Sequence, residues 1–211
     1  RRVLFRSMTL GEYAKMLVGE KWIKYSSTPN LKIIKCKNYT HDSKYILPVN
    51  PSPNLREMQS IYLYPSICFF EGTVMSEGRG TDKPFQIFGH PSLPSDLFSF
   101  TPKPNEGAKS SKCFNQVCYG WNLSGSINNT LKLIDRKIQL KYLLNAYKLF
   151  PDKDSFFLKN NFFNKLAGNA TLMKEIKNGI SENAIRKSWE KDLIKFKATR
   201  KKYLLYPDFK E

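Results

Sequence analysis

The sequence predicts an α+β fold, with a short mixed sheet, several packed helices and a long helix at the C-terminal end. Two patterns predict it: β-prone apolar runs lie before residue 124, and segments with helical spacing follow residue 137. The composition supports a real core, because 41% of the 211 residues are apolar and 14% are aromatic. No apolar run approaches the ~20 residues that a membrane-spanning helix needs.

The N-terminal segment is predicted to hold one helix and one strand. Residues 1–7 (RRVLFRS) contain neither an initiator methionine nor a secretion signal, and a common sequencing adapter encodes the same peptide, so we expect them to be non-native. Thr9 is a candidate helix N-cap, and Glu12 three residues later completes a capping box. LKIIKC at 31–36 is typical of a strand. We assign residues 8–45 to the junction with a preceding domain and expect the natural protein to extend before them.

Residues 46–211 are predicted to form a C-terminal α+β domain. The domain opens with a turn-rich segment at 46–56 that holds three prolines. The proline-rich residues 91–112 are typical of a long surface loop. Three strands are expected, the first of them bent at its central proline, at residues 60–70, 83–89 and 116–123.

Helices are predicted for the rest of the chain. The first ends at Pro151, and the next two short helices each end at a glycine. Ser181 is expected to cap the long helix, which places on one side Ile185, Trp189, Leu193, Phe196 and Arg200. The expected shorter helices span residues 137–150, 161–168 and 171–179.

The chain carries a strong positive charge, with 35 Lys and Arg against 18 Asp and Glu, or +17. Clustered cations of this number are typical of nucleic-acid binders, but here they are spread along the chain and no stacking aromatics interleave with them. Solvated helix faces are the favoured interpretation. Attraction to an anionic polymer such as peptidoglycan is a third.

Metal and cofactor sites have little support in the sequence. Cys113 and Cys118 are five residues apart, which is not a zinc-ribbon spacing, and His41 and His90 are the only histidines. We therefore expect no metal and no cofactor. The four cysteines allow disulfides in an exported protein, although Cys36 and Cys68 lie in apolar runs and are predicted to be buried thiols.

One stretch concentrates groups that suit a ligand site, EGTVMSEGRGT at residues 71–81. Its glycines at 72, 78 and 80 allow positive φ and close approach of the backbone to a ligand. Arg79 is suited to bind a carboxylate through two parallel hydrogen bonds, while Glu71 and Glu77 are suited to accept from hydroxyls or to act as an acid or base. A salt-bridged structural turn explains the same residues equally well.

The longer sequence around this stretch resembles a known family. LPVNPSPN followed by YLYPSICFFEGTVMSEGRGTDKPFQIFGHP resembles the C-terminal half of the exo-β-N-acetylmuramidases of the NamZ type. MTLGEYAKM near the start, QVCYG and the closing YLLY fit the same family in order. The resemblance covers nearly all of residues 8–211 and is strongest over 47–91.

The resemblance implies a bacterial glycoside hydrolase that releases N-acetylmuramic acid from the non-reducing ends of peptidoglycan fragments by hydrolysing a β-1,4 bond. It implies a Rossmann-like N-terminal domain that carries the catalytic carboxylates, a smaller C-terminal domain and a cleft between them. We therefore expect these 211 residues to lack the principal catalytic acid, to form one wall of the cleft and to be inactive alone. We also expect an exported protein, periplasmic or extracellular.

The resemblance gives the stretch at 71–81 a role in binding the sugar. Arg79 would bind the lactyl carboxylate that distinguishes muramic acid from glucosamine, Glu71 would bind hydroxyls or orient Arg79, and Asn54 would contact the N-acetyl group or a hydroxyl. From its loop alone, Asn54 is better explained as satisfying its own turn. The predicted substrate-binding residues are Glu71, Arg79, Asn54, Glu77, Thr73 and Ser76.

Two other functions remain open on the sequence. One is a non-catalytic module that binds cell-wall sugar, and the other is a basic nucleic-acid-binding protein. Salt-sensitive binding to DNA or RNA would indicate the latter.

Overall fold

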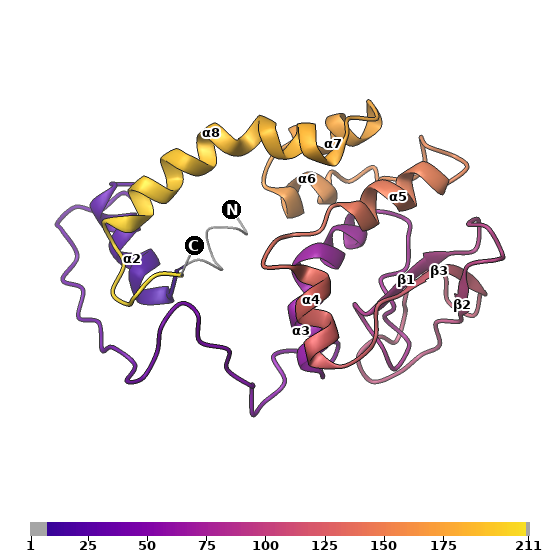
Figure 1. Ribbon diagram of the computed structural model, residues 1–211, viewed down its shortest axis with the longest axis horizontal. Coiled ribbons are helices and arrows are strands. Elements are labelled where there is room, and N and C mark those ends of the chain that lie inside the picture. The colour runs from indigo at the N-terminus through magenta and orange to yellow at the C-terminus, as the bar shows by residue number, and fades with distance from the viewer. Residues whose placement is uncertain (1–7, 210–211) are drawn as a thin grey trace. The chain divides into compact units, whose positions relative to one another are not determined.

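The computed structural model describes residues 8–209, which form two compact units (Figure 1). The first unit consists of residues 8–45 and 183–209, and the second of residues 46–182. The first unit contains helix α2 (Leu10–Gly19) and nearly all of helix α8 (Glu182–Lys201). The predicted domain assignment (8–45 and 46–211) stays a prediction, and the expectation for residues 1–7 concerns residues outside those described.

The second unit holds the remaining helices and the sheet, as the α+β prediction requires. Its helices are α3 (Met58–Ile67), the 3-10 helix η1 (Cys68–Gly72), α4 (Ile127–Ile134), α5 (Lys141–Leu149), α6 (Phe162–Ala167) and α7 (Thr171–Lys177). Its strands are β1 (Ile87–His90), β2 (Phe98–Phe100) and β3 (Cys118–Asn122). None of the helices in the described part of the chain is long and apolar enough to cross a membrane.

The sheet has the order β1-β3-β2, and both strand pairs are antiparallel. The prediction of a mixed sheet is therefore wrong, because the strands are joined by loops rather than by the helical crossovers that parallel pairing requires. Gly89 and Gly120 pair directly, and a side chain on Gly120 would meet the Phe88 carbonyl oxygen at 2.0 Å. These glycines allow the two backbones to approach closely.

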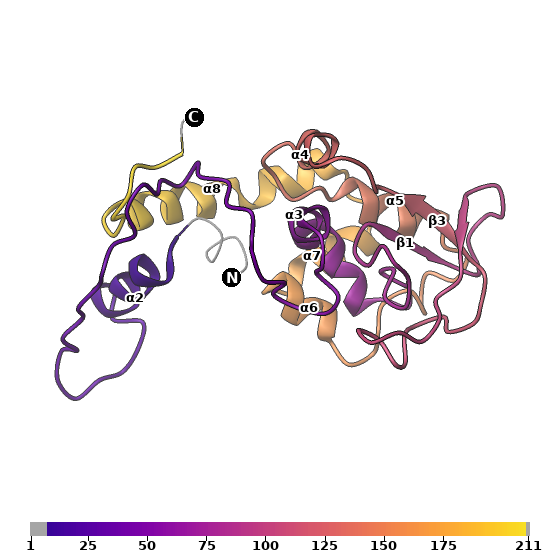
Figure 2. The same cartoon turned by 90° about the horizontal axis from the view of Figure 1, so that it is seen from below.

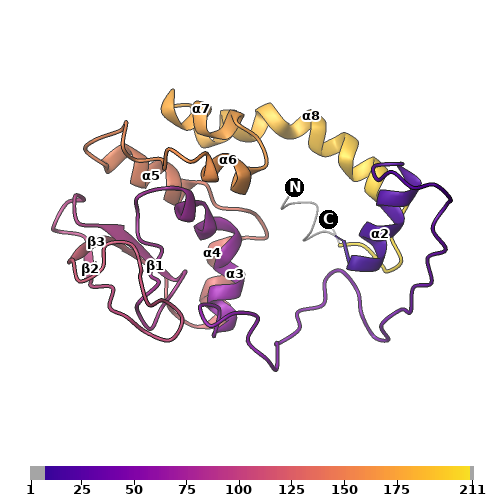
Figure 3. The same cartoon turned by 180° about the vertical axis from the view of Figure 1, so that it is seen from behind.

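The core of the second unit is built largely from phenylalanine. Phe70 stacks on Phe88 with ring centroids 4.7 Å apart, and Phe88 stacks in turn on Trp121 at 5.1 Å. Helix α3 packs beside α4 (Figure 2 and Figure 3), and η1 packs against α6. A side chain at Gly72 would lie 2.5 Å from the Cα atom of Phe163. The end of η1 is thus fixed against α6, directly beside Glu71.

The first unit is held together by a buried carboxylate. The predicted capping box is confirmed, because Thr9 and Glu12 satisfy each other's backbone N–H groups. Glu12 is fully buried, and its Oε1 also accepts from the Leu205 N–H at 2.7 Å and contacts His41 Nε2 at 3.0 Å. The Tyr206 hydroxyl accepts from the Cys36 N–H at 3.0 Å. These bonds join α2 and the following loop to the C-terminal tail.

The prediction of a strand at residues 60–70 is wrong. These residues form the end of α3 and the start of η1, with Pro65 inside the helix. Ser60, Leu63, Ser66 and Ile67 are buried, which is a helical spacing, so packing overrides the β propensity of the tyrosines and isoleucines.

The segment predicted as a strand at 31–36 has no regular structure. Ile34 and Cys36 are exposed, and no strand pairs with this segment within residues 8–209, so Cys36 is not the buried thiol that was expected. Cys68 is buried as predicted. The sequence reading also missed α4 and placed β2 within a loop.

The C-terminal helices agree better with prediction. Helices α5, α6 and α7 lie within the expected ranges, α8 begins directly after Ser181, and Gly168 ends α6 in the left-handed conformation. The predicted apolar side of α8 is only partly buried, since Ile185 and Arg200 are buried while Leu193 is exposed.

Candidate functional site

The stretch at 71–81 is a loop anchored on regular structure at several points. Glu71 lies in η1, and Ser76 exchanges backbone hydrogen bonds with Gly89 of β1 at 2.8 and 3.0 Å. Gly78 and Gly80 have φ near +80°, as predicted, and Gly80 approaches Lys103 so closely that a side chain would meet its carbonyl oxygen at 2.7 Å. The loop therefore has one defined path, and its side chains project from fixed positions.

The loop brings Glu71, Glu77 and Arg79 together. Arg79 Nη2 donates to Glu71 Oε2 at 3.2 Å, and Nη1 lies 3.4 Å from Glu77 Oε1. Glu77 is buried and Glu71 is largely buried, with side chains 3% and 11% exposed, whereas the Arg79 side chain is 35% exposed. The guanidinium is thus held from beneath by buried anions and faces outward.

An aromatic ring supports the same guanidinium. The Arg79 Cζ atom lies 5.2 Å from the centroid of Phe85, which is buried. Phe85 has φ of +61°, a conformation that bulky residues rarely adopt, and its N–H donates to the Glu77 carbonyl oxygen at 2.8 Å. Strained backbone of this kind concentrates at binding and catalytic sites.

A fourth charged residue completes the cluster. Lys112 Nζ lies 3.0 Å from Glu77 Oε2 and donates to the carbonyl oxygens of Phe70 and Met75 at 2.8 and 3.1 Å. Lys112 was not predicted from the sequence, because it belongs to the long loop. No local pattern relates it to its partners, which lie 35 or more positions earlier in the chain. We call Glu71, Glu77, Arg79 and Lys112 the charged cluster.

The charged cluster is incompletely hydrogen-bonded. Within the described part of the chain, buried Glu71 Oε1 and Arg79 Nε have no hydrogen-bond partner. Arginine has five N–H donors, and only two contacts to carboxylates use them here. Unpaired buried polar atoms are rare in folded proteins. The cluster therefore retains hydrogen-bonding capacity for an anion or a polyol.

The other predicted site residues have internal partners. Thr73 donates to the Phe70 carbonyl oxygen at 2.9 Å, and the Ser76 hydroxyl accepts from the Gly78 N–H at 3.2 Å. Both side chains are buried, so they shape the loop. Asn54 donates to the Gly107 carbonyl oxygen at 2.7 Å, which ties the proline-rich segment to the long loop. Their predicted contacts with sugar stay predictions.

Two thiols lie next to the charged cluster. Cys113 and Cys118 are both free. A hydrogen bond from Cys118 lowers the pKa of the Cys113 thiol, burial opposes this, and the Lys112 ammonium adds to the lowering. The same hydrogen bond and burial raise the pKa of Cys118. The lowered pKa favours the thiolate form at Cys113.

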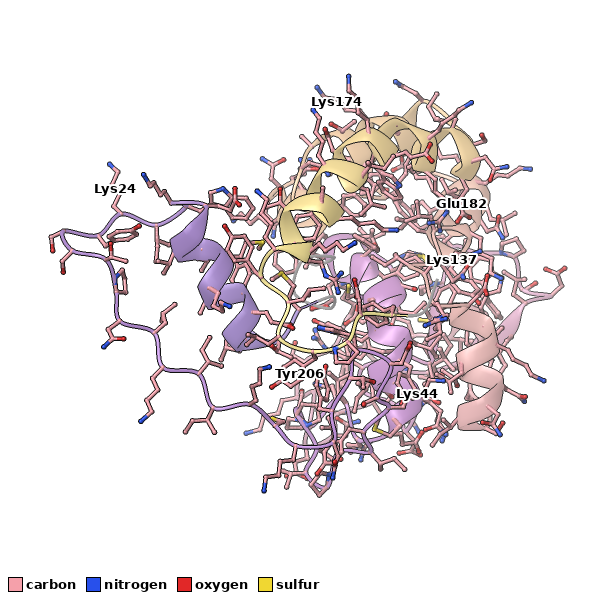
Figure 4. All side chains as sticks on the ribbon, turned by 60° about the vertical axis from the view of Figure 1, so that its left-hand side comes forward. Lys24, Lys44, Lys137, Lys174, Glu182 and Tyr206 are labelled. Carbon is pink, nitrogen blue, oxygen red and sulfur yellow. The ribbon has the colours of Figure 1, made fainter. Side chains whose placement is uncertain are left out.

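Other chemistries find little support in the described residues. No three His, Cys, Asp or Glu side chains of residues 8–209 gather as metal ligands would. The His90 side chain is partly buried, its pKa is lowered by that burial, and its Nδ1 accepts from the Ser92 N–H at 3.1 Å, so it closes a local turn. Lys24 and Lys174 project away from the ribbon (Figure 4), as expected for solvated charges.

Comparisons with known proteins agree with this architecture. A crystallised DUF1343 family protein from Bacteroides fragilis NCTC 9343 matches with a TM-score of 0.87 at 46% identity, and the match covers 96% of this chain and 56% of that one. A second DUF1343 protein of the same strain, with a TM-score of 0.69 at 21% identity, covers 94% and 56% and shares the fold.

Sequence comparison gives the family. The peptidoglycan β-N-acetylmuramidase NamZ of Bacillus subtilis (strain 168) is 34% identical over an alignment of 224 positions, which covers 96% of this chain and 51% of that protein. The chain thus spans about half the length of this curated relative. The family profile described as exo-β-N-acetylmuramidase NamZ, N-terminal, matches residues 2–59, and its C-terminal counterpart matches residues 62–206. The chain therefore belongs to the NamZ exo-β-N-acetylmuramidase family.

Proposed function

We propose that these residues are part of a peptidoglycan-degrading glycoside hydrolase that releases N-acetylmuramic acid from non-reducing ends by hydrolysing a β-1,4 bond. The observation that carries the proposal is Arg79, a partly exposed guanidinium held by the buried carboxylate of Glu77, the largely buried carboxylate of Glu71 and an aromatic ring. Family membership supplies the reaction class, because a relative at 34% identity is a peptidoglycan β-N-acetylmuramidase.

The chemistry of the charged cluster fits a muramic acid ligand. A guanidinium binds a carboxylate strongly when the pair is shielded from water, and the lactyl group of muramic acid supplies that carboxylate. Glu71 holds the guanidinium through Oε2, and in our proposal it orients Arg79 toward the sugar. The cluster thus matches an acidic, hydroxyl-rich sugar better than a neutral one.

We assign Glu71 and Glu77 to binding and orientation rather than to proton transfer. Both carboxylates are in contact with Arg79, and Glu77 also contacts Lys112. Glycosidases generally use two carboxyl groups, ~5 Å apart in retaining and ~6.5–9.5 Å apart in inverting enzymes. In our proposal the principal catalytic acid comes from a Rossmann-like domain of the longer protein, which forms the opposite wall of the cleft. The enzyme acts outside the cytoplasm, in the periplasm or beyond the cell.

The test is an Arg79→Ala substitution in the full-length protein. Turnover of a disaccharide with non-reducing N-acetylmuramic acid is compared with turnover of the N-acetylglucosamine analogue. Loss of the lactyl contact should lower kcat/KM for the muramic substrate on the order of 100-fold and leave the slow glucosamine reaction nearly unchanged. Unchanged turnover of the muramic substrate would refute the role of Arg79.

The dependence on the rest of the protein is tested separately. The 211 residues alone should bind muropeptides without cleaving them, and adding the preceding domain should produce cleavage. Binding that remains non-catalytic in the full-length protein would favour a sugar-binding module instead. Robust release of N-acetylmuramic acid by the 211 residues would contradict the assignment of the catalytic acid to another domain.

A further inference from the structure

Lys112 reaches the charged cluster from a separate part of the sequence and uses its full donor capacity there. Its ammonium group contacts three oxygens, Glu77 Oε2 and the carbonyls of Phe70 and Met75, at distances between 2.8 and 3.1 Å. A lysine ammonium has three N–H donors. Lys112 therefore has no donor left for a ligand, and any role in the reaction acts through its neighbours.

The contacts of Lys112 set the geometry of the loop beneath Arg79. The Phe70 carbonyl precedes Glu71, the Met75 carbonyl lies midway along the loop, and Glu77 lies beyond it. By occupying Glu77 Oε2, Lys112 leaves Oε1 for the contact with Arg79. One side chain thus binds the Glu77 carboxylate directly and fixes the backbone on the N-terminal side of Glu71 through the Phe70 carbonyl.

Lys112 also balances the charge of the cluster. Glu71 and Glu77 carry two negative charges and Arg79 only one positive charge, so these three residues alone would repel an anionic ligand. Lys112 brings the formal charge of the cluster to zero. Because the carboxylates are buried, this compensation is screened less than it would be at an exposed site.

We propose that Lys112 is a positioning residue that sets the preference of this site for acidic over neutral sugars. It does so by neutralising Glu77, which leaves the charge of Arg79 available to the ligand carboxylate, and by holding the loop in one conformation. This inference rests on the proposed function, because it presupposes that Arg79 binds a carboxylate.

The decisive experiment compares four variants of the full-length protein, Lys112→Met, Lys112→Arg, the double variant Glu77→Gln with Lys112→Met, and Lys109→Met as a matched control. Lys109 is an exposed lysine of the same loop, so its loss removes equal charge outside the cluster. Each variant is assayed with a non-reducing N-acetylmuramic acid disaccharide and with the same disaccharide carrying a neutral lactyl amide.

We expect Lys112→Met to lower kcat/KM for the acidic substrate on the order of 10-fold more than for the amide, mainly through KM. Lys112→Arg keeps the charge and should restore much of the preference, and Lys109→Met should behave as the parent protein. The double variant restores neutrality without the lysine. Its ratio of acidic to amide turnover should be higher than that of Lys112→Met. The double variant therefore tests the charge compensation even where Lys112→Met folds poorly.

Equal losses on both substrates in Lys112→Met and in the double variant would overturn the inference, because an unchanged ratio of acidic to amide turnover would mean a purely structural lysine. Failure of the proposed function looks different, because the parent protein and the Arg79→Ala variant would then show the same ratio of acidic to amide turnover.

Discussion

Two ionic networks of this molecule differ in how completely their atoms are paired. In the first unit, Glu12 Oε2 accepts from the backbone N–H and the hydroxyl of Thr9, and its Oε1 contacts His41 and Leu205. Arg200 forms a bidentate pair with Asp208, with both bonds at 2.7 Å. In the charged cluster of the second unit the Arg79 contacts are longer, at 3.2 and 3.4 Å, and two buried atoms lack partners among the residues described.

The difference separates a structural network from a binding one. A fully paired carboxylate contributes its whole interaction energy to the fold, and has no capacity left for a ligand. A network with longer contacts and unpaired atoms contributes less to stability, and gains when a ligand completes it. Both networks contain buried glutamates, so burial alone does not distinguish them.

The largest effect that tests this comparison is the loss of Glu12. Glu12→Ala should lower the free energy of unfolding by about 3 kcal/mol, because it leaves the N–H of Leu205 and the N-terminus of α2 without their partner. Urea denaturation followed by tryptophan fluorescence measures it. With Trp121 replaced by Phe, the remaining reporters Trp22 and Trp189 both lie in the first unit.

The matched substitution is Glu71→Ala in the second unit. It should cost less than about 1 kcal/mol of stability, because the Glu71–Arg79 contact is long and partly solvated, while lowering turnover of the muramic substrate in the full-length protein. Equal destabilisation by the two substitutions would remove the distinction between the networks.

A smaller effect is the pH dependence of the stability that the network around Glu12 contributes. Burial by itself would raise the pKa of Glu12, but bonds from Leu205, Thr9 and His41 outweigh it, and the pKa lies below its ordinary value of 4.5. The stability that this carboxylate contributes is therefore complete above 4.5 and is lost as the pH falls through the lowered pKa. Urea midpoints measured down to about pH 3 should fall less steeply for Glu12→Gln than for the parent protein.

The smallest effect on sugar preference concerns Asn54. Asn54→Ala should lower stability by about 1 kcal/mol, because it removes the hydrogen bond to the Gly107 carbonyl oxygen, and should leave the ratio of muramic to glucosamine turnover unchanged. Thermal unfolding and the two-substrate assay measure the two quantities. A loss of affinity for the N-acetyl group at unchanged stability would support the sugar contact expected from the family resemblance.

Local patterns predicted much of the fold. The capping box at Thr9 and Glu12 was predicted because it depends on residues three apart. Helices α5 to α8 followed from helical spacing, with proline or glycine marking the ends of α5, α6 and α7. The segment at 60–70 was predicted wrongly, because its β-prone residues are helical only through burial against the rest of the unit.

The charged cluster, too, was predictable from the sequence only in part. The sequence by itself determined that Glu71, Glu77 and Arg79 would share a glycine-rich loop, since chain connectivity keeps residues within nine positions close together. Only the tertiary structure decided that the carboxylates are buried, that Phe85 lies against the guanidinium and that Lys112 neutralises Glu77. The physical reason is that burial and ion pairing depend on segments far apart in the chain, whose approach is fixed by packing and leaves no local pattern.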